Sequence, residues 1–342
     1  MSHLFFALKH LTCFLCGLLL MCSPPVGLAN AADEVVVYSA RGEPFIKPLF
    51  DAYTKETGVA IQFITDKEGA LMARLQAEGE RTSADLLLTS DAGNLWQAAE
   101  TGLLTPVDSA RLRLNVPAHL RDAKDRWFGL SLRVRTIVYH TDRVKPADLS
   151  TYEALGNPQW KGRLCLRTSK KVYNQSLVAM MIAALGVPKT EQVVRSWIAN
   201  LATSVFSDDT QVMEAIAAGQ CDVGIVNSYY FGRLKKKKPA LPLALFWANQ
   251  GDRGVHVNIS GAGLVKHAKR PKAAIRLLEW LSGDFAQERL AALDFEYPIR
   301  PGIPIPPAVV AWGTFKPESF NVARAGELQA EAIKLMDRAG YK

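Results

Sequence analysis

The sequence has few cysteines, and it has no second long hydrophobic run after its first thirty residues. Five cysteines in 342 residues are too few for a scaffold held together by disulfides. The lack of further apolar segments excludes a polytopic membrane protein. A hydrophobic content of 49% with 22% charged residues excludes wholesale disorder and is typical of an ordinary globular protein.

The motifs of common enzyme classes are also missing. The six histidines are scattered, and there is no His-Glu-x-x-His, Gly-x-Ser-x-Gly, Walker or Gly-x-Gly-x-x-Gly motif. The formal net charge of +8 is spread along the chain, apart from Lys235–Lys238, and no nucleic-acid-binding motif accompanies it. These absences favour a binding protein over an enzyme and predict no nucleic-acid partner.

The first 31 residues have the pattern of a secretory signal peptide. A short basic segment precedes an apolar run that is too short to span a bilayer, and Ala29-x-Ala31 follows as a cleavage site. An uncleaved anchor is the alternative, and lipid attachment at Cys22 is disfavoured because Met21 is bulky. We expect cleavage after Ala31 and export to the periplasm.

Two cysteines remain after this cleavage. Cys165 and Cys221 each lie beside a short apolar run that could form neighbouring strands. An exported protein reaches a compartment in which disulfides persist. A Cys165–Cys221 bridge and two buried free thiols both remain open at this point.

Strand and helix patterns alternate along the rest of the chain. The pattern predicts strands at 34–38, 59–64 and 84–88 with helices between them, and hence an α/β fold whose helices cover a mostly parallel sheet. Two longer extended segments, 129–139 and 255–265, are suited to cross between two lobes. In such folds the ligand lies at the carboxyl ends of strands, in the cleft between the lobes.

The crossing segments define the expected domain boundaries. Residues 1–31 form the signal peptide, 32–135 the first part of lobe 1, 136–257 lobe 2, 258–305 the return to lobe 1, and 306–342 a C-terminal helical segment that packs on lobe 2.

Three tyrosines stand where predicted strands end. Tyr229 and Tyr230 follow the apolar run 223–226, and a strand-to-helix turn is where two adjacent phenols can both point into one cleft. Taken alone, this pair is better explained as one core ring and one surface ring. Tyr173 shifts the balance, because it follows the predicted strand 163–167 and precedes the predicted helix 176–185. Two strands of one lobe thus bring three phenols to their carboxyl ends.

Around these tyrosines the sequence resembles the periplasmic ferric-iron-binding proteins of ABC transporters. The segments that carry the resemblance are 38–41, 91–96, 173–178, 221–225 and 227–230. The resemblance extends over the mature chain and implies a bilobal periplasmic-binding-protein fold of type II. It further implies a monomer that binds Fe³⁺ through Tyr173, Tyr229 and Tyr230 and serves an inner-membrane ABC permease and its ATPase.

The chemistry of the tyrosines is consistent with this cargo. Fe³⁺ is a small, hard ion that prefers anionic oxygen over thiolate ligands. A free phenol has a pKa near 10 and is neutral at pH 7, but a bound metal drives its proton off. Three phenolates would offset the three charges of the ion.

The opposite lobe offers fewer certain ligands. Many relatives carry a His shortly after the first strand, where this chain has Gly42. Glu43 could supply a carboxylate to the metal, although it could also simply cap the helix before Pro44. Arg41 and Arg135 are candidates to hold a small synergistic anion such as carbonate, since a guanidinium makes bidentate contacts with oxyanions.

Two other functions remain possible from the sequence. In the first, the same fold binds a small organic or inorganic anion through Arg41, Arg133 and Arg135, with the tyrosines as hydrogen-bond donors. Arg133 and Arg135 alternate along a predicted strand, however, and could form a solvated face instead. The second is a secreted iron-dependent enzyme, which usually needs clustered histidines that this chain lacks.

Overall fold

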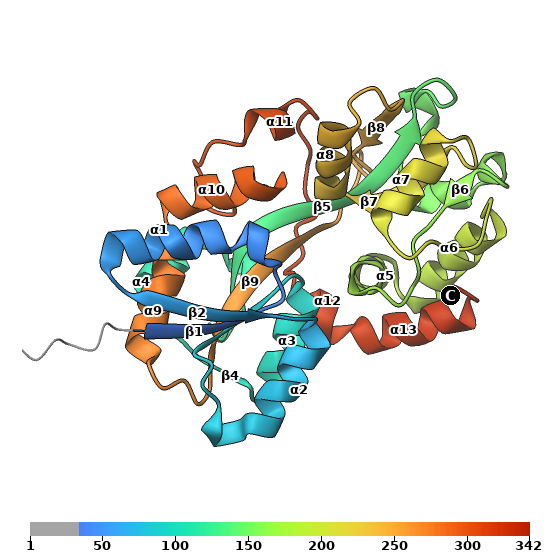
Figure 1. The fold of residues 1–342 in the computed structure, drawn as a ribbon. Helices are drawn as coiled ribbons and strands as arrows, with labels where there is room; N and C mark the ends of the chain where they lie inside the picture. The colour runs from blue at the N-terminus through green and yellow to red at the C-terminus, as the bar shows by residue number, and fades with distance from the viewer. Residues whose placement is uncertain (1–33) are drawn as a thin grey trace, which may run out of the picture. The chain divides into compact units, whose positions relative to one another are not determined.

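The computed structural model describes residues 34–342, so the predicted signal peptide lies outside the described residues. The described chain has an α/β fold (Figure 1). Its strands are β1 (Glu34–Ser39), β2 (Ala60–Thr65), β3 (Leu86–Thr89), β4 (Leu104–Thr105), β5 (Phe128–His140), β6 (Leu164–Cys165), β7 (Val223–Asn227), β8 (Leu243–Phe246) and β9 (Val257–Val265). Its α-helices are α1 (Lys47–Thr57), α2 (Glu68–Glu78), α3 (Ala92–Glu100), α4 (Ala110–Asn115), α5 (Val172–Leu185), α6 (Val187–Ala199), α7 (Asp209–Ala217), α8 (Ser228–Lys237), α9 (Pro271–Leu281), α10 (Asp284–Asp294), α11 (Pro307–Val310), α12 (Arg324–Glu327) and α13 (Gln329–Arg338).

Local sequence explains several of these elements. The β-branched run of β1 favours an extended chain that is buried on both faces. Helix α3 is capped at its N-terminus by Asp91, whose carboxylate accepts a hydrogen bond from the Gly93 amide. Helix α1 ends at Gly58, which adopts the left-handed conformation with φ of 74° that glycine tolerates best.

The sheet is mixed rather than mostly parallel. Its strand order is β2-β1-β3-β9-β5-β7-β6, with β4 added beside β9 and β8 beside β5. Only the β1–β2, β1–β3 and β6–β7 pairs of the described chain are parallel. The expectation of a mostly parallel sheet was wrong because β5 and β9 enter the sheet as long crossing strands, antiparallel to every strand they pair with.

Strand β5 joins the two halves of the sheet. Its first part, Phe128 to Val134, pairs with β9, and its second part, Arg135 to Tyr139, pairs with β7. Figure 1 shows β5 and β9 running together through the middle of the molecule. One hydrophobic cluster packs around β1, β3 and the helices α1 to α3, and the other two pack around β6, β7 and the helices α5 to α7. The change of pairing partner at residue 135 falls at the predicted end of the first lobe segment.

The C-terminal segment covers α5. Helix α13 packs against α5 and α6, while the short α12 contacts both α3 and α5 (Figure 1). Near the end of the chain the Tyr341 hydroxyl donates to the Arg167 carbonyl at 2.6 Å and accepts from the Asn174 amide at 2.9 Å. The last residues therefore support the first turn of α5, which carries Tyr173.

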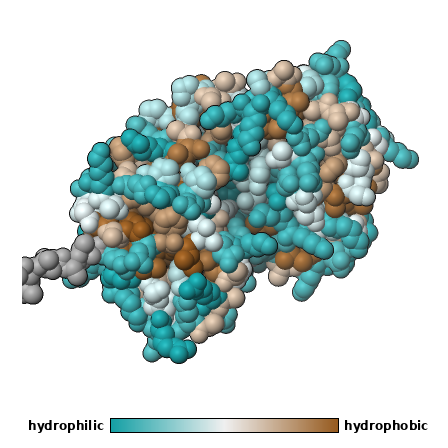
Figure 2. Space-filling model, viewed as in Figure 1, coloured by the Kyte–Doolittle hydropathy of each residue, from teal (hydrophilic) through white to brown (hydrophobic). Residues whose placement is uncertain are grey.

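The surface is mainly polar. The face in Figure 2 is largely hydrophilic, with hydrophobic residues confined to separate areas. Within residues 34–342 no helix combines the length and the apolar character needed to cross a bilayer.

Cys165 and Cys221 form a disulfide, with their Cα atoms 6.0 Å apart. The structure therefore favours the bridge over two free thiols. Cys165 ends β6, and Cys221 lies just before β7, the parallel neighbour of β6. The bridge thus fastens together the two strands that precede the tyrosine-bearing helices.

Removing this bridge is expected to destabilise the protein. It closes a span of 56 residues, for which loss of unfolded-state entropy corresponds to about 4 kcal/mol. The double variant Cys165→Ala/Cys221→Ala should lose roughly 2–5 kcal/mol of unfolding free energy in urea titrations at 25 °C. Reduced wild-type protein is the matched control and should show a similar loss; a change below about 1 kcal/mol in both would contradict a stabilising bridge.

Candidate functional site

The three predicted tyrosines lie in the first turns of two helices. Helix α5 begins at Val172, four residues earlier than the sequence pattern indicated, so that Tyr173 is within the helix rather than before it. Helix α8 begins at Ser228, directly after β7, and carries Tyr229 and Tyr230. Because β6 and β7 are parallel neighbours, their carboxyl ends lie side by side, and the chain leaves both strands at that end of the sheet.

This arrangement brings the tyrosines into one pocket. The rings of Tyr229 and Tyr230 have centroids 4.5 Å apart at an angle of 31°. The phenols of Tyr173 and Tyr229 are close enough for each to affect the pKa of the other. All three line a cavity of about 160 Å³, so the structure brings the three predicted side chains together.

The rest of the pocket wall is rich in charge. It includes three arginines and two carboxylates that come from both halves of the molecule: Arg41, Arg133, Arg233, Asp294 and Glu296. Ser90, Ser260 and Gly42 also contribute to it. Positive charge therefore exceeds negative charge in the wall as long as the phenols are neutral.

Arg41 follows β1 and is 5% exposed. Its Nη1 atom donates to the Glu296 carboxylate at 2.7 Å and to the Ser260 hydroxyl at 3.3 Å. Among the described residues its Nη2 atom has no hydrogen-bond partner, and the Asp294 carboxylate lies 3.8 Å away. One edge of this buried guanidinium is thus available to an oxyanion in the pocket.

Arg233 connects α8 to the opposite wall. Its Nε and Nη2 atoms donate to the two carboxylate oxygens of Asp294 at 2.6 and 2.5 Å. Its guanidinium carbon also lies 4.8 Å from the ring centroid of Tyr229 and 4.2 Å from that of Phe45. This pair therefore links the helix that carries two of the tyrosines to the end of α10.

A glycine permits this approach of α8 to α10. A Cβ atom on Gly232 would lie 2.5 Å from the Phe295 ring, which is closer than real Cβ contacts. Phe295 itself adopts the left-handed conformation, with φ of 54°, as it ends α10. The turn at Phe295 leaves Asp294 and Glu296, on either side of it, both in the pocket wall.

Burial keeps the phenols of Tyr173 and Tyr229 protonated in the metal-free protein. It raises the pKa of Tyr173 and Tyr229 above the ordinary value of 10, while the nearby Arg133 guanidinium opposes the rise. Burial also raises the pKa of Asp294 to about 6, with a further rise from Glu296 and an opposing effect of the hydrogen bonds from Arg233. The phenols of Tyr173 and Tyr229 therefore need a cation in the pocket in order to ionise near neutral pH.

Asp294 and Glu296 are site residues that the sequence interpretation missed. Their signal was the spacing Asp-x-Glu directly before Tyr297, in a stretch that had been assigned to no element. Both are at least 95% buried, which carboxylates seldom are unless they are paired. Their partners, Arg41 and Arg233, are far away in the sequence, so the pairing was visible only in the fold.

Glu43 and Arg135 do not line the tyrosine pocket. Glu43 opens a short 3-10 helix, Glu43–Phe45, and its side chain is exposed. Arg135 is 2% exposed and donates to the side chains of Asn174, Asp209 and Asn227 at 2.6–3.0 Å. Their predicted roles as metal and anion ligands thus find no support in these positions.

The contacts of Arg135 indicate a positioning role instead. Asn174 is adjacent to Tyr173, and Asn227 precedes Tyr229 by two residues. One guanidinium therefore ties together the first turns of α5 and α8. Arg133, which could have faced solvent, is also buried, and it lines the pocket with hydrogen bonds to the Ser90 carbonyl and to Ser260.

The donors gathered here differ from those of the most common metal sites. Within residues 34–342 no group of three or more His, Cys, Asp and Glu side chains is placed to hold a metal ion. Tyrosine oxygen is the donor that converges in the pocket, and it suits hard, highly charged cations rather than soft ones.

Replacing Arg135 should be costly, whereas replacing Glu43 should not. Arg135→Met leaves the fully buried Asp209 with only Arg167, at 3.5 Å, as an ionic partner. We expect a loss of about 3–5 kcal/mol in urea unfolding, as for other broken buried pairs. Glu43→Gln is the exposed control and should change stability by less than about 0.5 kcal/mol. Equal effects of the two variants would refute the positioning role of Arg135.

This chain is similar to a family of solute-binding proteins and to relatives named for iron. The model of the bacterial extracellular solute-binding protein family matches residues 48–317. Iron uptake protein A1 of Synechocystis sp. is 38% identical over 329 residues, which cover 94% of this chain and 91% of that protein. The Fe(3+)-binding periplasmic protein of Serratia marcescens is 27% identical over 318 residues, with 91% and 92% covered.

Solved structures of iron-binding proteins are also similar to this chain. A Trichodesmium protein (IdiA, FutA) in complex with iron and citrate superposes with a TM-score of 0.87 at 41% identity, over 90% of this chain and all of that one. Ferric iron-binding protein A of Mannheimia haemolytica, in an open conformation, has a TM-score of 0.86 at 37% identity, over 91% and 99% of the two chains.

Proposed function

Because the chain belongs to the bacterial extracellular solute-binding protein family, with the type II fold of its ferric-binding neighbours, we propose that it binds ferric iron for import. The phenolate oxygens of Tyr173, Tyr229 and Tyr230 are the proposed ligands. The observation that carries this proposal is the convergence of three tyrosines in a single pocket of about 160 Å³. In this proposal the protein captures and delivers a solute and does not catalyse a reaction.

The physical chemistry of the pocket supports this cargo. Three neutral phenols become three anionic oxygens when Fe³⁺ displaces their protons, so the ion supplies the charge that drives its own site to form. The same ligands would bind softer divalent ions less well. The cavity is also small for an organic ligand, since small-molecule sites usually measure about 300–1,000 Å³.

The names of the relatives agree with the chemistry. The two Synechocystis relatives are iron uptake proteins, and the relatives from Serratia and Neisseria are named for binding ferric iron. The chain covers more than nine tenths of each of these proteins.

A small anion completes the proposed iron shell. Arg41 is buried in the pocket wall with Nη2 free of hydrogen bonds to the described residues, and it could hold carbonate or another oxyanion next to the metal. The structure of the Trichodesmium neighbour is of a complex with iron and citrate ligands. Three tyrosines and a synergistic anion can bind the ion without the histidine that Gly42 replaces and without the exposed Glu43.

The proposed location and partners follow from the family and the leader sequence. The signal peptide, cleaved after Ala31, would export the protein to the periplasm as a monomer. There it would present iron to an inner-membrane ABC permease and its ATPase, after the two lobes close over the ion. Closure would remove water from the ion and strengthen each phenolate contact.

Loss of one phenolate should be visible in both affinity and colour. Tyr229→Phe removes a proposed ligand, so ferric affinity should fall at least about a hundredfold, the upper range for loss of a group that merely supports a ligand. A visible charge-transfer band from phenolate to iron should weaken with it in optical titrations. Tyr139→Phe is the control, because Tyr139 lies on β5 and outside the pocket wall.

Two outcomes would contradict the ferric assignment. One is an unchanged band and affinity in the double variant Tyr229→Phe/Tyr230→Phe. The other is a colourless wild-type protein that ignores ferric iron but binds a small anion, which would favour the alternative of an anion-binding protein that uses the pocket arginines.

Ferric binding should release protons. Because burial raises the pKa of Tyr173 and Tyr229, these two phenols are protonated in the metal-free protein at pH 7, and affinity should rise with pH. A pH-stat titration should record about three protons per ferric ion from the protein, after subtraction of the chelator blank, and about two from Tyr230→Phe. Release of less than about one proton by the wild type would exclude phenolate ligation.

A further inference from the structure

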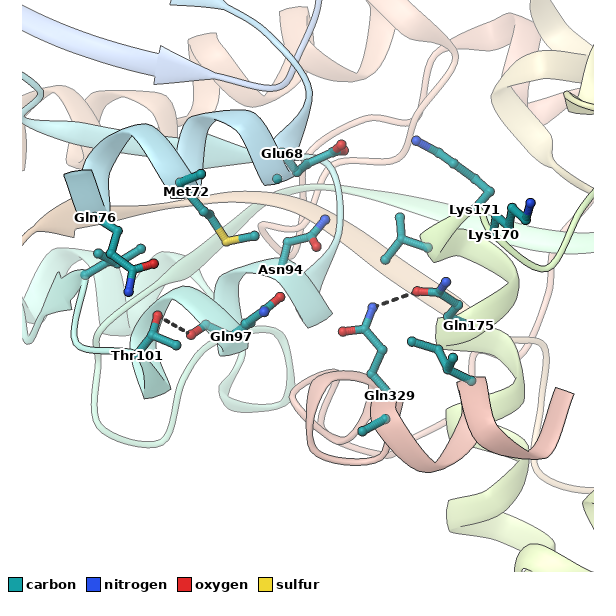
Figure 3. A pocket seen from close by; sticks show the side chains of 16 residues that line it. Glu68, Met72, Gln76, Asn94, Gln97, Thr101, Lys170, Lys171, Gln175 and Gln329 are labelled. Carbon is teal, nitrogen blue, oxygen red and sulfur yellow. Dashed lines mark hydrogen bonds between the residues drawn. The ribbon is translucent and has the colours of Figure 1, made fainter. Parts of the chain in front are cut away.

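A second and larger cavity lies beside the tyrosine pocket. It has a volume of about 620 Å³ and is bounded by α2, α3, the start of α5 and α13 (Figure 3). Four glutamines from these four helices point toward it: Gln76, Gln97, Gln175 and Gln329. We refer to this cavity as the amide groove. Unlike the tyrosine pocket, it falls within the size range of sites for small organic molecules.

Asn94 marks the groove as a site for a hydrogen-bond acceptor. This residue lies in the first turn of α3, is 7% exposed, and lines the groove. Figure 3 shows its amide below Glu68, on the side that faces Lys171. Within the described part of the chain its Nδ2 atom has no hydrogen-bond partner, and a buried donor left in this state costs free energy of folding. An acceptor on a bound ligand would recover that energy.

Two ammonium groups stand on the other side of the same space. Lys170 and Lys171 precede α5 and line the groove (Figure 3). Neither forms an ion pair with a carboxylate of residues 34–342. The N-terminal end of α5 adds its positive dipole to theirs. Together with Asn94 these groups favour a ligand with carboxylate oxygens.

The remaining polar groups favour hydroxyls on the same ligand. Glu68, at the start of α2, faces the lysines across the groove and can only accept hydrogen bonds when ionised (Figure 3). A ligand hydroxyl could donate to it. Gln329 already donates to the Gln175 side chain at 3.0 Å, and Gln175 donates to the Ser169 carbonyl at 3.2 Å (Figure 3). The amides of Gln76 and Gln97, which both donate and accept, can pair with hydroxyl and carboxylate groups of a ligand.

Lys171 connects the groove to the tyrosine pocket. Its Nζ atom lies 4.6 Å from the ring centroid of Tyr173, and Lys171 also lines the groove. A ligand in the groove would thus lie next to the proposed iron site without occupying it.

We propose that the amide groove binds the hydroxycarboxylate chelator that accompanies ferric iron. This inference rests on the proposed ferric function, and it assigns the organic part of the cargo to a site of its own. The tyrosine pocket takes the ion and a small anion, whereas the neighbouring groove holds the larger polyanionic ligand through Asn94, Lys170 and Lys171.

Citrate without metal is the probe that tests this site. Iron-free wild-type protein should bind it in a calorimetric titration, and Asn94→Asp should weaken binding at least about tenfold, because a carboxylate repels the ligand where an amide would donate. Because Asn94 is 7% exposed and a buried carboxylate costs stability, the urea unfolding of this variant is recorded beside that of the wild type, and the lysine variant below carries the test if it unfolds. Ferric affinity measured without citrate should stay within about twofold of the wild type.

Matched variants locate the ligand. Lys170→Gln/Lys171→Gln should weaken citrate binding, whereas Lys161→Gln/Lys189→Gln, which removes the same charge at exposed positions elsewhere, should not. Propane-1,2,3-tricarboxylate, which lacks only the hydroxyl of citrate, should bind the wild type more weakly. Tyr229→Phe/Tyr230→Phe should keep metal-free citrate binding, so that failure of the ferric assignment is detected separately.

Three results would overturn the inference. The first is the absence of citrate binding to iron-free wild type. The second is equal binding to the wild type and Asn94→Asp. The third is binding that Arg41→Gln abolishes and the lysine double variant leaves intact, which would place the anion in the tyrosine pocket and leave the groove as space between the helices.

Discussion

The parallel pairing of β6 with β7 is the constraint on which the tyrosine cluster depends. The register places Leu164 opposite Val223 and Cys165 opposite Gly224. The two strands therefore have their carboxyl ends on the same side of the sheet, and each is followed there by a helix that carries tyrosine. The ladder is only two residues long, and a short ladder specifies register weakly. The Cys165–Cys221 bridge and the hydrogen bonds of Arg135 supply additional links between the same two segments.

Buried charge in the pocket is held by reciprocal pairing. Removing a charged group from water costs several kcal/mol unless partners surround it. Arg41 is paired with Glu296, and Arg233 with Asp294, each across a large distance in sequence. These pairs hold cationic groups around the phenols without neutralising the excess of positive charge. An anion is therefore favoured in the pocket, whether it is a phenolate or a bound oxyanion.

Much of the fold could be predicted because its signals are local. The alternation of apolar strands with amphipathic helices indicated an α/β protein, and the unusual length of segments 129–139 and 255–265 indicated strands that cross between lobes. The direction of the strands was less accessible, since pairing depends on where the crossing strands insert. Tyr229 and Tyr230 were found because a strand-to-helix turn is visible in sequence, and Tyr173 because it repeats that context.

The site beyond the tyrosines was harder to predict. Alternation along β5 made Arg133 and Arg135 look equivalent, because residues two apart share a face of a strand. In the fold β5 changes its partner from β9 to β7 between them, so Arg133 reaches the pocket while Arg135 is enclosed by Asp209 and two asparagines. Glu43 had the right chemistry, but its short helix leaves it exposed.

The sequence by itself determined the class of fold, the two strand ends that carry phenols, and the hard-cation chemistry of those phenols, because each follows from neighbouring residues and ordinary side-chain properties. Only the tertiary structure decided which arginines reach the pocket, that Asp294 and Glu296 join them, and that Asn94 faces a second cavity. Such juxtapositions depend on how distant segments pack, and hydrophobic patterning constrains the face of an element but not its neighbours across the molecule.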